Sequence, residues 1–308
     1  MSAQSRSRKL APYLLLMPFL ATFVVFMVYP LVLSVVMVTQ YTYGARTWTY
    51  VGLDNLRHLI VDPLFWKSMW NTVLFASGSL FLQLPLALGL AMLLNRKDLR
   101  FRGFFRLIFF APSLVGLVFV GILAALMFEK RTGLINLMLF RVTDLLFGAL
   151  PEGGLRQSLI WNVDYPWLQE YVMPALIISA LWMYVGFNMI YFLAALQNVN
   201  RDIEEAALVD GAGPWQRFLN VTLPAIKPIG TFVVLLSLIG SFQLFELPYI
   251  LLNNSAGPNN QGLTPVMYLY QRGFEANQLG EASAIGWVLA LVLFSFAIGQ
   301  KLITREKL

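Results

Sequence analysis

The chain has 308 residues, of which 58% are hydrophobic and 12% are charged, and its formal net charge is +6. Soluble domains carry about 25% charged residues, so this composition excludes an ordinary soluble domain. The absence of cysteine excludes disulfides, thiol nucleophiles and cysteine-based metal sites. The single histidine, His58, stands in a polar stretch, and because metal ligands come in clusters we expect no metal site.

Six long apolar blocks predict an all-α polytopic membrane protein with six transmembrane helices. A hydrocarbon core about 30 Å thick needs about 20 helical residues, and each block is long enough. A β-barrel would show short alternating segments instead. We expect one transmembrane domain over residues 1–308, with spans at 11–36, 70–94, 107–128, 173–196, 229–252 and 283–301. Apart from Lys301 at the end of the last span, Glu246 is the one charged residue within these blocks.

The positive charges are distributed unevenly between the loops. If the N-terminus is cytoplasmic, the inner segments 1–10, 95–106, 197–228 and 301–308 hold 14 of the 22 Lys and Arg. Counting acids as well, the inner segments carry +8 and the outer loops −1. Inner loops of membrane proteins are enriched in Lys and Arg, so this pattern predicts that both termini are cytoplasmic. It also assigns the basic excess to topology and membrane lipid rather than to nucleic acid.

The outer loops 40–70, 129–172 and 253–282 are long enough to fold locally, and the first two are rich in Trp and Tyr. Such rings partition to the headgroup region of a bilayer. These loops could receive a partner protein, or they could act only as a lid and an anchor.

The inner segment 197–228 predicts two short helices. Asp202 is a plausible N-cap, with Glu205 three residues later completing a capping-box pattern. Gly211 supplies a stop, because glycine enters the left-handed conformation without steric cost, and Pro214 suits the first turn of a second helix. A helix of about nine residues is unstable alone, so the first must dock against something. A helix lying on the lipid surface would carry more Lys and Arg than this acidic segment does.

Polar side chains within the apolar blocks mark a candidate substrate pathway, because such groups are costly in lipid and tend to face a cavity. Tyr184, Asn188 and Tyr191 fall on one helical stripe, and Gln243 falls on the same face as Glu246. Aromatic rings, amides and a carboxylate in a narrow cavity suit a carbohydrate. The alternative is that they hydrogen-bond neighbouring helices. A weaker set comprises Asn71, Ser77, Ser79 and Gln83.

The segment Glu205-Ala206-Ala207, three residues, Gly211, nine residues and Val221-Thr-Leu223-Pro224 resembles the EAA motif of permease subunits of ATP-binding-cassette (ABC) importers. Val221 stands where isoleucine is usual. The rest of the chain is similar to the maltose and glycerol-3-phosphate type of sugar permease. Stretches that carry this similarity include Val51-Gly-Leu-Asp-Asn55, Gly133-Leu-Ile-Asn136, Gly186-Phe-Asn188, Ser241-Phe-Gln-Leu-Phe-Glu246 and Tyr268-Leu-Tyr-Gln-Arg-Gly-Phe274. It departs from the family at Ser255-Ala-Gly-Pro258, where Thr-Gly-Gly-Pro is usual, and in a longer 140–170 loop.

The resemblance implies a permease subunit of the bacterial inner membrane that translocates a carbohydrate: a sugar, an oligosaccharide, a polyol or glycerol phosphate. It implies a heterodimer with a second permease subunit, two copies of a cytoplasmic ATPase subunit that bind ATP and Mg, and an extracytoplasmic solute-binding protein. The residues it assigns to coupling with the ATPase are Glu205, Ala206, Ala207, Asp210, Gly211, Leu223 and Pro224. The sequence itself has no G-x-x-x-x-G-K-[ST] phosphate loop, so we expect no enzyme activity and no cofactor in this chain.

Two other classes of protein compete with this interpretation. An ion-coupled secondary transporter would use Glu246 as its ion site, but it has no need of a docking helix in an inner loop. A membrane enzyme needs converging nucleophiles, acid–base pairs or metal ligands, which one core carboxylate and one outer histidine do not supply.

Overall fold

The computed structural model describes residues 3–43, 47–96, 98–151 and 153–305. Within these residues the chain is helical except for one two-stranded sheet and its loops. It divides into two compact units, which are described separately. Unit 1 comprises Met1–Pro63 and Tyr268–Leu291, and unit 2 comprises Leu64–Met267 and Val292–Leu308. The prediction of a single membrane domain stays a prediction.

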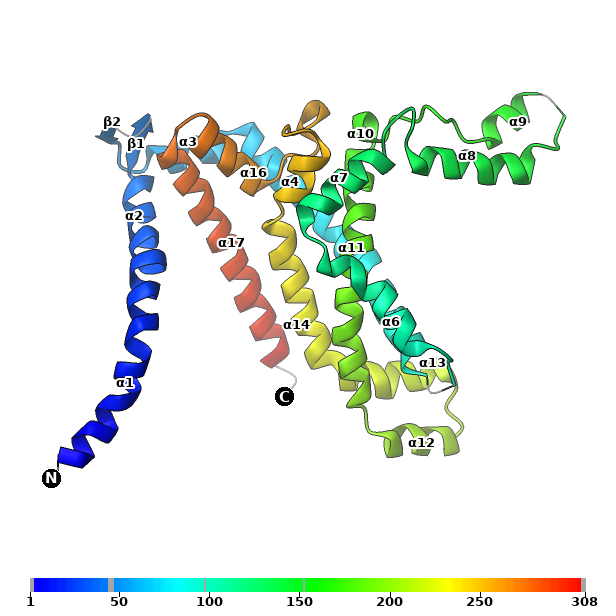
Figure 1. The fold of residues 1–308 in the computed structure, drawn as a ribbon, viewed down its shortest axis with the longest axis horizontal. Coiled ribbons are helices and arrows are strands. Elements are labelled where there is room, and N and C mark those ends of the chain that lie inside the picture. The colour runs from blue at the N-terminus through cyan, green and yellow to red at the C-terminus, as the bar shows by residue number, and fades with distance from the viewer. Residues whose placement is uncertain (1–2, 44–46, 97, 152, 306–308) are drawn as a thin grey trace. The chain divides into compact units, whose positions relative to one another are not determined.

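Unit 1 contains a long N-terminal helix in three parts, a hairpin and a short helix (Figure 1). Its elements are α1 (Ala3–Phe23), the π-turn η1 (Val24–Val28), α2 (Tyr29–Val38), β1 (Gln40–Tyr43), β2 (Thr47–Tyr50), α3 (Asp54–Val61) and the π-turn η6 (Gln271–Glu275). Two helices, α16 (Pro265–Tyr270) and α17 (Leu279–Arg305), cross the boundary between the units.

The hairpin corrects the prediction of an all-α chain. β1 pairs antiparallel with β2, with Gln40 opposite Tyr50. The amide of buried Asn55 donates hydrogen bonds to the Val38 and Gln40 carbonyls, at 2.7 and 2.9 Å. The Gly280 N–H donates to Thr42 Oγ1 at 2.8 Å, and a Cβ at Gly280 would lie 2.0 Å from the Gln40 oxygen. The alternating Thr and aromatic residues of Tyr41–Tyr50 are typical of a strand pair and could have predicted it.

Unit 2 contains the remaining helices. They are α4 (Pro63–Gly78), η2 (Ser79–Gln83), α5 (Leu84–Asn95), α6 (Arg102–Phe110), η3 (Ala111–Leu114), α7 (Leu117–Met127), α8 (Leu134–Phe147), α9 (Gly154–Leu159), α10 (Trp167–Glu170), α11 (Val172–Gln197), α12 (Arg201–Val209), α13 (Pro214–Arg217), η4 (Phe218–Thr222), α14 (Leu223–Phe242), α15 (Glu246–Leu251) and η5 (Pro258–Asn260). In Figure 1, α12 and α13 lie at one end of this unit and α7, α8 and α10 lie at the other.

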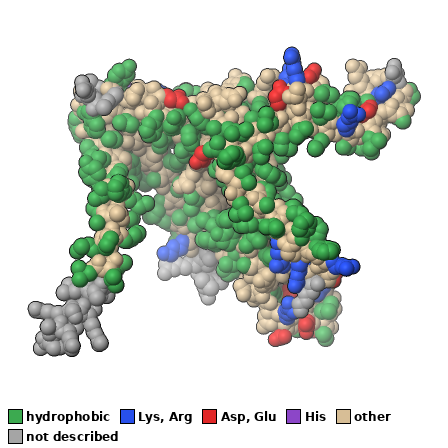
Figure 2. Space-filling model, viewed as in Figure 1, with side chains coloured by type: hydrophobic (Ala, Val, Ile, Leu, Met, Phe, Trp, Pro, Cys, Tyr) green, Lys and Arg blue, Asp and Glu red, His purple; other side chains and the backbone are tan. Residues whose placement is uncertain are grey.

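Five helices in the described residues are long and apolar enough to cross a membrane, and a bent pair makes six possible spans. The five are Tyr13–Val38, Pro63–Asn95, Val172–Gln197, Pro214–Phe242 and Leu279–Leu302. The pair is Arg102–Leu114 with Leu117–Met127. Charged side chains of unit 2 gather near its two ends, and hydrophobic ones cover much of the surface between them (Figure 2). The chain is therefore a helical polytopic membrane protein, as the apolar blocks predicted.

The third predicted span, 107–128, is broken rather than straight. Its two halves meet at an angle of 98°. Pro112 lies in the 3₁₀ turn that ends the first half, and Val115 and Gly116 are extended. A proline lacks the N–H that continues a helix, and its ring crowds the preceding turn, which accounts for the break.

The fifth span begins and ends earlier than the prediction of 229–252. It runs from Pro214 through the π-turn η4 into α14 and ends at Phe242. Pro224 follows the π-turn η4, whose last hydrogen bond runs from the Leu223 N–H to the Phe218 carbonyl, five residues back, and Pro228 lies inside α14. After Phe242 the chain leaves the helix and starts the short α15 at Glu246.

Helix α11 is at the centre of unit 2. It packs along α5, where Leu84, Ala87, Ala91 and Leu94 meet Val185, Met189 and Phe192. Its other half packs with α7 and α15 around Val120, Leu176 and Leu247. Dispersion contacts between closely packed helices stabilise membrane proteins, because lipid offers no hydrophobic drive for helix association.

Candidate functional site

The loop between α11 and α14 forms the helix α12, which is capped at both ends. The Asn200 side chain, not Asp202 as predicted, caps its start by accepting a hydrogen bond from the Asp202 N–H at 2.9 Å. At its end the Gly211 N–H donates to the Leu208 carbonyl at 3.1 Å, and the Ala212 N–H donates to the Ala207 carbonyl at 2.9 Å. These two bonds and the φ of +82° at Gly211 make a Schellman motif. The predicted glycine stop is thus present in the structure.

One side of α12 is attached to unit 2, and the other is exposed. Glu204 is half-buried and accepts a hydrogen bond from the buried Thr222 hydroxyl at 3.4 Å, which joins α12 to the start of the fifth span. Glu205 and Ala206 are exposed. Leu208 and Val209 are exposed as well, Val209 to 87%. A short helix with an exposed apolar and acidic surface is suited to contact a partner.

The residues after Gly211 continue the same surface. Pro214 starts α13 as predicted, and the Gln216 side chain accepts a hydrogen bond from the Gly213 N–H at 3.0 Å. Trp215 is 69% exposed and stacks on Phe218. Leu223 and Pro224, at the start of α14, are also exposed. The structure therefore brings the predicted coupling residues to one end of unit 2, with Leu223 and Pro224 on the adjoining helix.

A second feature is a small cavity of about 120 Å³ between α4, α11 and α14 in unit 2. Tyr184 and Asn188 of α11 line it, together with Ser79 and Gln83 of η2. Asn188 and Gln83 are both 5% exposed. The third wall consists of Ser237, Gly240 and Ser241 of α14, which sequence reasoning did not single out. Three small residues at helical spacing, two of them with hydroxyl groups, are the signal that could have identified this wall.

Other predicted pathway residues lie elsewhere. Tyr191 packs edge-on between Phe187 and Phe232, with ring centroids at 5.2 and 6.0 Å. Gln243 ends α14 and Glu246 starts α15, so they do not share one helical face, and both are exposed. The shift of the fifth span explains this difference.

Of the weaker predicted set of pathway residues, two line the cavity and two do not. Ser79 and Gln83 line the cavity. Asn71 has a structural role instead, because its side-chain amide donates to the Asn260 and Leu263 carbonyls at 2.7 and 3.0 Å. Ser77 is half-buried and donates to the Val73 carbonyl at 2.8 Å within its own helix.

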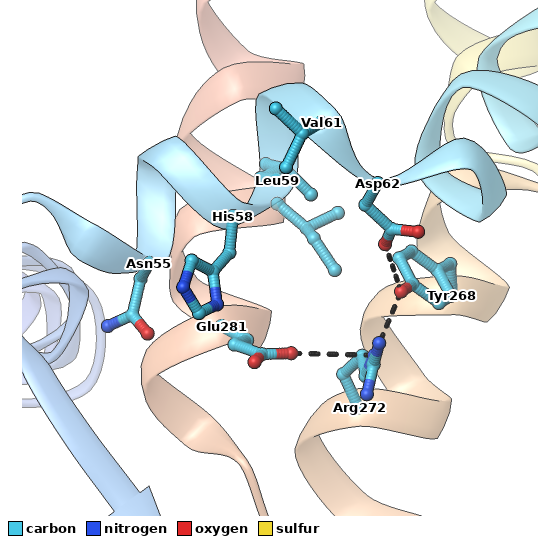
Figure 3. Close-up of a pocket in the computed structure, with 9 residues that line it drawn as sticks. Asn55, His58, Leu59, Val61, Asp62, Tyr268, Arg272 and Glu281 are labelled. Carbon is cyan, nitrogen blue, oxygen red and sulfur yellow. Dashed lines mark hydrogen bonds and ion pairs between the residues drawn. The ribbon is translucent and has the colours of Figure 1, made fainter.

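Unit 1 has a polar cluster that the sequence did not predict (Figure 3). The Tyr268 hydroxyl donates to Asp62 Oδ2 and accepts from Arg272 Nε at 2.9 Å. Arg272 also pairs with Glu281 at 3.4 Å and lies 5.3 Å from the Tyr268 ring centroid. A cavity of about 320 Å³ adjoins these residues and is also lined by Asn55 and His58. Asp62 and Tyr268 are 206 positions apart, so no local pattern indicates their contact.

Burial, followed by the hydrogen bond to Asp62, raises the pKa of Tyr268 from 10.0 to about 12. The folded state therefore retains this proton at a pH where the unfolded state has lost it. The stability that the phenol contributes is present below about pH 10 and is lost as the pH rises through 12.

We expect the melting temperature of Tyr268→Phe to be lower than that of the wild type at neutral pH. The difference between the two melting temperatures should shrink as the pH rises from 10 to 12. Tyr50→Phe, at a ring that is 81% exposed, is the matched control and should keep the wild-type profile. A difference in melting temperature between Tyr268→Phe and the wild type that stays constant to pH 12 would contradict the burial of this phenol.

The described residues contain no cluster of three or more His, Cys, Asp or Glu that could hold a metal ion.

The comparisons with known proteins agree with this geometry. The family model described as the inner membrane component of binding-protein-dependent transport systems matches residues 83–306. The arabinooligosaccharides transport system permease protein AraP of Bacillus subtilis is 36% identical over 93% of this chain and 86% of its own length. The lactose transport system permease protein LacF of Rhizobium radiobacter is 33% identical over 96% of this chain and 94% of its own.

A solved structure has the same fold. It is a bacterial ABC transporter involved in import of the acidic polysaccharide alginate. One of its chains superposes with a TM-score of 0.81 at 24% identity, covering 99% of this chain and 98% of that one. The family match covers the cavity helices α11 and α14 and the α12 loop. The chain belongs to the family of inner membrane permease components of binding-protein-dependent transport systems.

Proposed function

We propose that this chain is the permease subunit through which an ABC importer moves a carbohydrate, most specifically an oligosaccharide, across the bacterial inner membrane. The observation that carries the proposal is the capped, exposed helix α12 within the loop that matches the EAA motif. The names of related permeases, for arabinooligosaccharides, lactose and diacetylchitobiose, support a saccharide as the solute.

Helix α12 would be the coupling helix, docked on a cytoplasmic ATPase subunit. A docked helix transmits force only if it is joined to the span that moves, and the Glu204–Thr222 hydrogen bond, at 3.4 Å, links α12 to the fifth span. Glu205, Ala206 and the exposed Leu208 and Val209 would face the ATPase. This assignment puts the α12 end of unit 2 in the cytoplasm. We propose the same side for both termini, from the excess of Lys and Arg in the inner segments.

The proposed assembly contains a second permease subunit, two copies of the ATPase and an extracytoplasmic solute-binding protein. ATP and Mg would be held by the ATPase subunits, because this sequence has no phosphate-binding loop. A solved complex of the related alginate transporter includes a periplasmic protein that carries an alginate pentasaccharide, which supports the presence of a binding protein here.

The cavity between α4, α11 and α14 would form part of the solute pathway. Its volume of about 120 Å³ is smaller than the roughly 300–1,000 Å³ of ordinary ligand pockets. We infer that the second permease supplies the rest of the wall. The Asn188 and Gln83 amides and the serine hydroxyls would hydrogen-bond sugar hydroxyls, and the Tyr184 ring would lie against an apolar sugar face.

The rival interpretation, an ion-coupled carrier, gains no support. Its expected ion site, Glu246, is exposed at the start of α15 and does not line the cavity.

The proposal is tested by reconstituting the chain into liposomes with its partner permease, ATPase and binding protein. We expect uptake of radiolabelled oligosaccharide to require ATP and every subunit. We expect Asn188→Leu to reduce uptake severalfold without reducing the ATP hydrolysis that the loaded binding protein stimulates. Ser77→Leu, on the same protein but outside the cavity, is the matched control and should transport normally. Uptake by the permeases alone, driven by an ion gradient, would support the carrier instead.

A further inference from the structure

Helix α8 presents an apolar face that no other described element of unit 2 covers. Its opposite face is occupied by the segment 153–167. Buried Asn136 accepts hydrogen bonds from the indole N–H groups of Trp161 and Trp167, at 3.1 and 2.9 Å. Thr143 Oγ1 accepts one from the Trp161 backbone N–H at 2.9 Å. The rotation of α8 about its axis is therefore fixed by these contacts.

The remaining face is strongly apolar. Residues three or four apart lie on one side of a helix, and on this side the side chains are hydrophobic and exposed. They are Leu134, Met138, Val142, Leu145 and Leu146, with Leu145 exposed to 86%. Arg141 is exposed in the same stripe. Burying such a face is worth about 25 cal/mol per Å² of apolar surface, so water is an unfavourable environment for it.

The position of the face indicates what covers it. Only residues 128–133 separate α8 from α7, whose own apolar side chains Phe119 and Leu126 are exposed. In Figure 1, α8 runs across the direction of α11. The segment with α9 lies on one side of α8, and the body of unit 2, with α11 and α6, extends toward the other. The apolar face of α8 points away from the α9 segment, and so it lies on the side toward which the body of unit 2 extends.

The charges and aromatic rings fit a lipid surface. A long arginine side chain such as Arg141 can extend from an apolar helix face to a lipid phosphate. Trp161, Tyr165 and Trp167 cluster on the opposite face of α8, beside Asn136, where the headgroups would lie above the acyl chains, with neighbouring ring centroids 4.6 to 5.8 Å apart. Trp and Tyr are the residues enriched where a protein crosses the boundary between headgroups and acyl chains.

We propose that α8 is an interfacial amphipathic helix, which lies in the bilayer surface at this end of unit 2 with Met138 and Leu145 among the acyl chains. It would anchor the 129–172 loop on the membrane, and the α9 segment would be held above it on the water side. This inference concerns lipid contact and does not depend on the solute or on the coupling helix.

The chain has no cysteine, so single spin labels can be introduced without other changes. Met138→Cys and Leu145→Cys test the face. Phe119→Cys, on α7, is the control for a lipid-exposed position, and exposed Ser158→Cys, on α9, is the control for a water-exposed one. The labelled chain, purified with its partner subunits, is placed in nanodiscs of phosphatidylethanolamine and phosphatidylglycerol. Power saturation then compares collisions with oxygen, which concentrates in acyl chains, and with a water-soluble nickel chelate.

We expect labels at 138 and 145 to collide severalfold more with oxygen than with nickel, as at 119, and the label at 158 to show the reverse. Two results would overturn the proposal. If 138 and 145 behave like 158, the face is in water. If both reagents are excluded at 138 and 145, another protein subunit covers it.

Discussion

Gly211→Val should reduce solute uptake at least about tenfold while the chain still inserts into the membrane. Gly211 has a φ of +82°, and a Cβ there would meet nothing within 4 Å, so the effect of the substitution is conformational and not a clash. The left-handed conformation costs an ordinary residue about 1–2 kcal/mol, and more where the side chain is β-branched. That cost is small compared with the stability of the whole protein. It falls on α12, however, a nine-residue helix that is barely stable by itself.

The matched control is Gly211→Asn, because asparagine tolerates the left-handed conformation better than other non-glycine residues. We expect uptake to fall at least about tenfold with valine, the loss that 1.4 kcal/mol produces in an equilibrium constant, and to be partly retained with asparagine. Transport is measured in liposomes with the ATPase and the binding protein, and insertion is measured as the amount of chain in the membrane fraction.

Glu205→Lys tests the same contact without altering the backbone. Glu205 is exposed on α12, whereas Glu204 is half-buried and holds Thr222. Reversing the charge at 205 should prevent the ATPase from co-purifying, with normal insertion. If co-purification and uptake survive both Gly211→Val and Glu205→Lys, α12 is not the coupling helix.

The spans could be predicted because each is a long uncharged block, and a segment in lipid must form its own backbone hydrogen bonds. The breaks within the spans could not be predicted from the sequence. Pro112 interrupts the third span, whereas Pro228 lies inside α14 without ending it. Proline in a membrane helix is tolerated when neighbouring turns adjust, as η4 does before α14, and hydropathy does not register this.

The ends of the short helices in the α12 loop could be predicted, because each depends on one residue and its immediate neighbours. Gly211 follows the end of α12 with a positive φ, and Pro214 is the first residue of α13, as the backbone preferences of glycine and proline favour. The predicted N-cap at Asp202 is wrong, because the helix begins at Arg201 and the Asn200 side chain accepts the hydrogen bond from the Asp202 N–H. The cavity could be predicted only in part, because Ser237 and Ser241 line it together with Asn188 through the packing of α14 on α11, which no sequence spacing specifies.

Gly186→Ala should be strongly destabilising, because this glycine is where two helices of unit 2 touch through their backbones. A Cβ on Gly186 would lie 1.7 Å from the Phe109 carbonyl oxygen and 2.9 Å from the Phe110 nitrogen. Both atoms belong to the backbone at the end of α6, so no rotamer change can make room. Adding a methyl group to a packed core costs about 1–3 kcal/mol, and more where the neighbours cannot move.

The matched control is Gly89→Ala on α5, where a Cβ meets nothing within 4 Å. Alanine is favoured over glycine in a helix by about 1 kcal/mol, so this change should be neutral or slightly stabilising. Both variants gain the same methyl group in a helix of unit 2, and they differ only in what that methyl meets. The melting temperature in detergent, followed by the loss of monodisperse protein on size exclusion, compares them.

A lower melting temperature for Gly186→Ala alone would mean that the close approach of α6 and α11 contributes to the stability of this fold. Asn188, which lines the cavity, lies two residues further along α11. Melting temperatures that match for the two variants would mean that α6 can separate from α11 at little cost, and that the cavity wall does not depend on this approach.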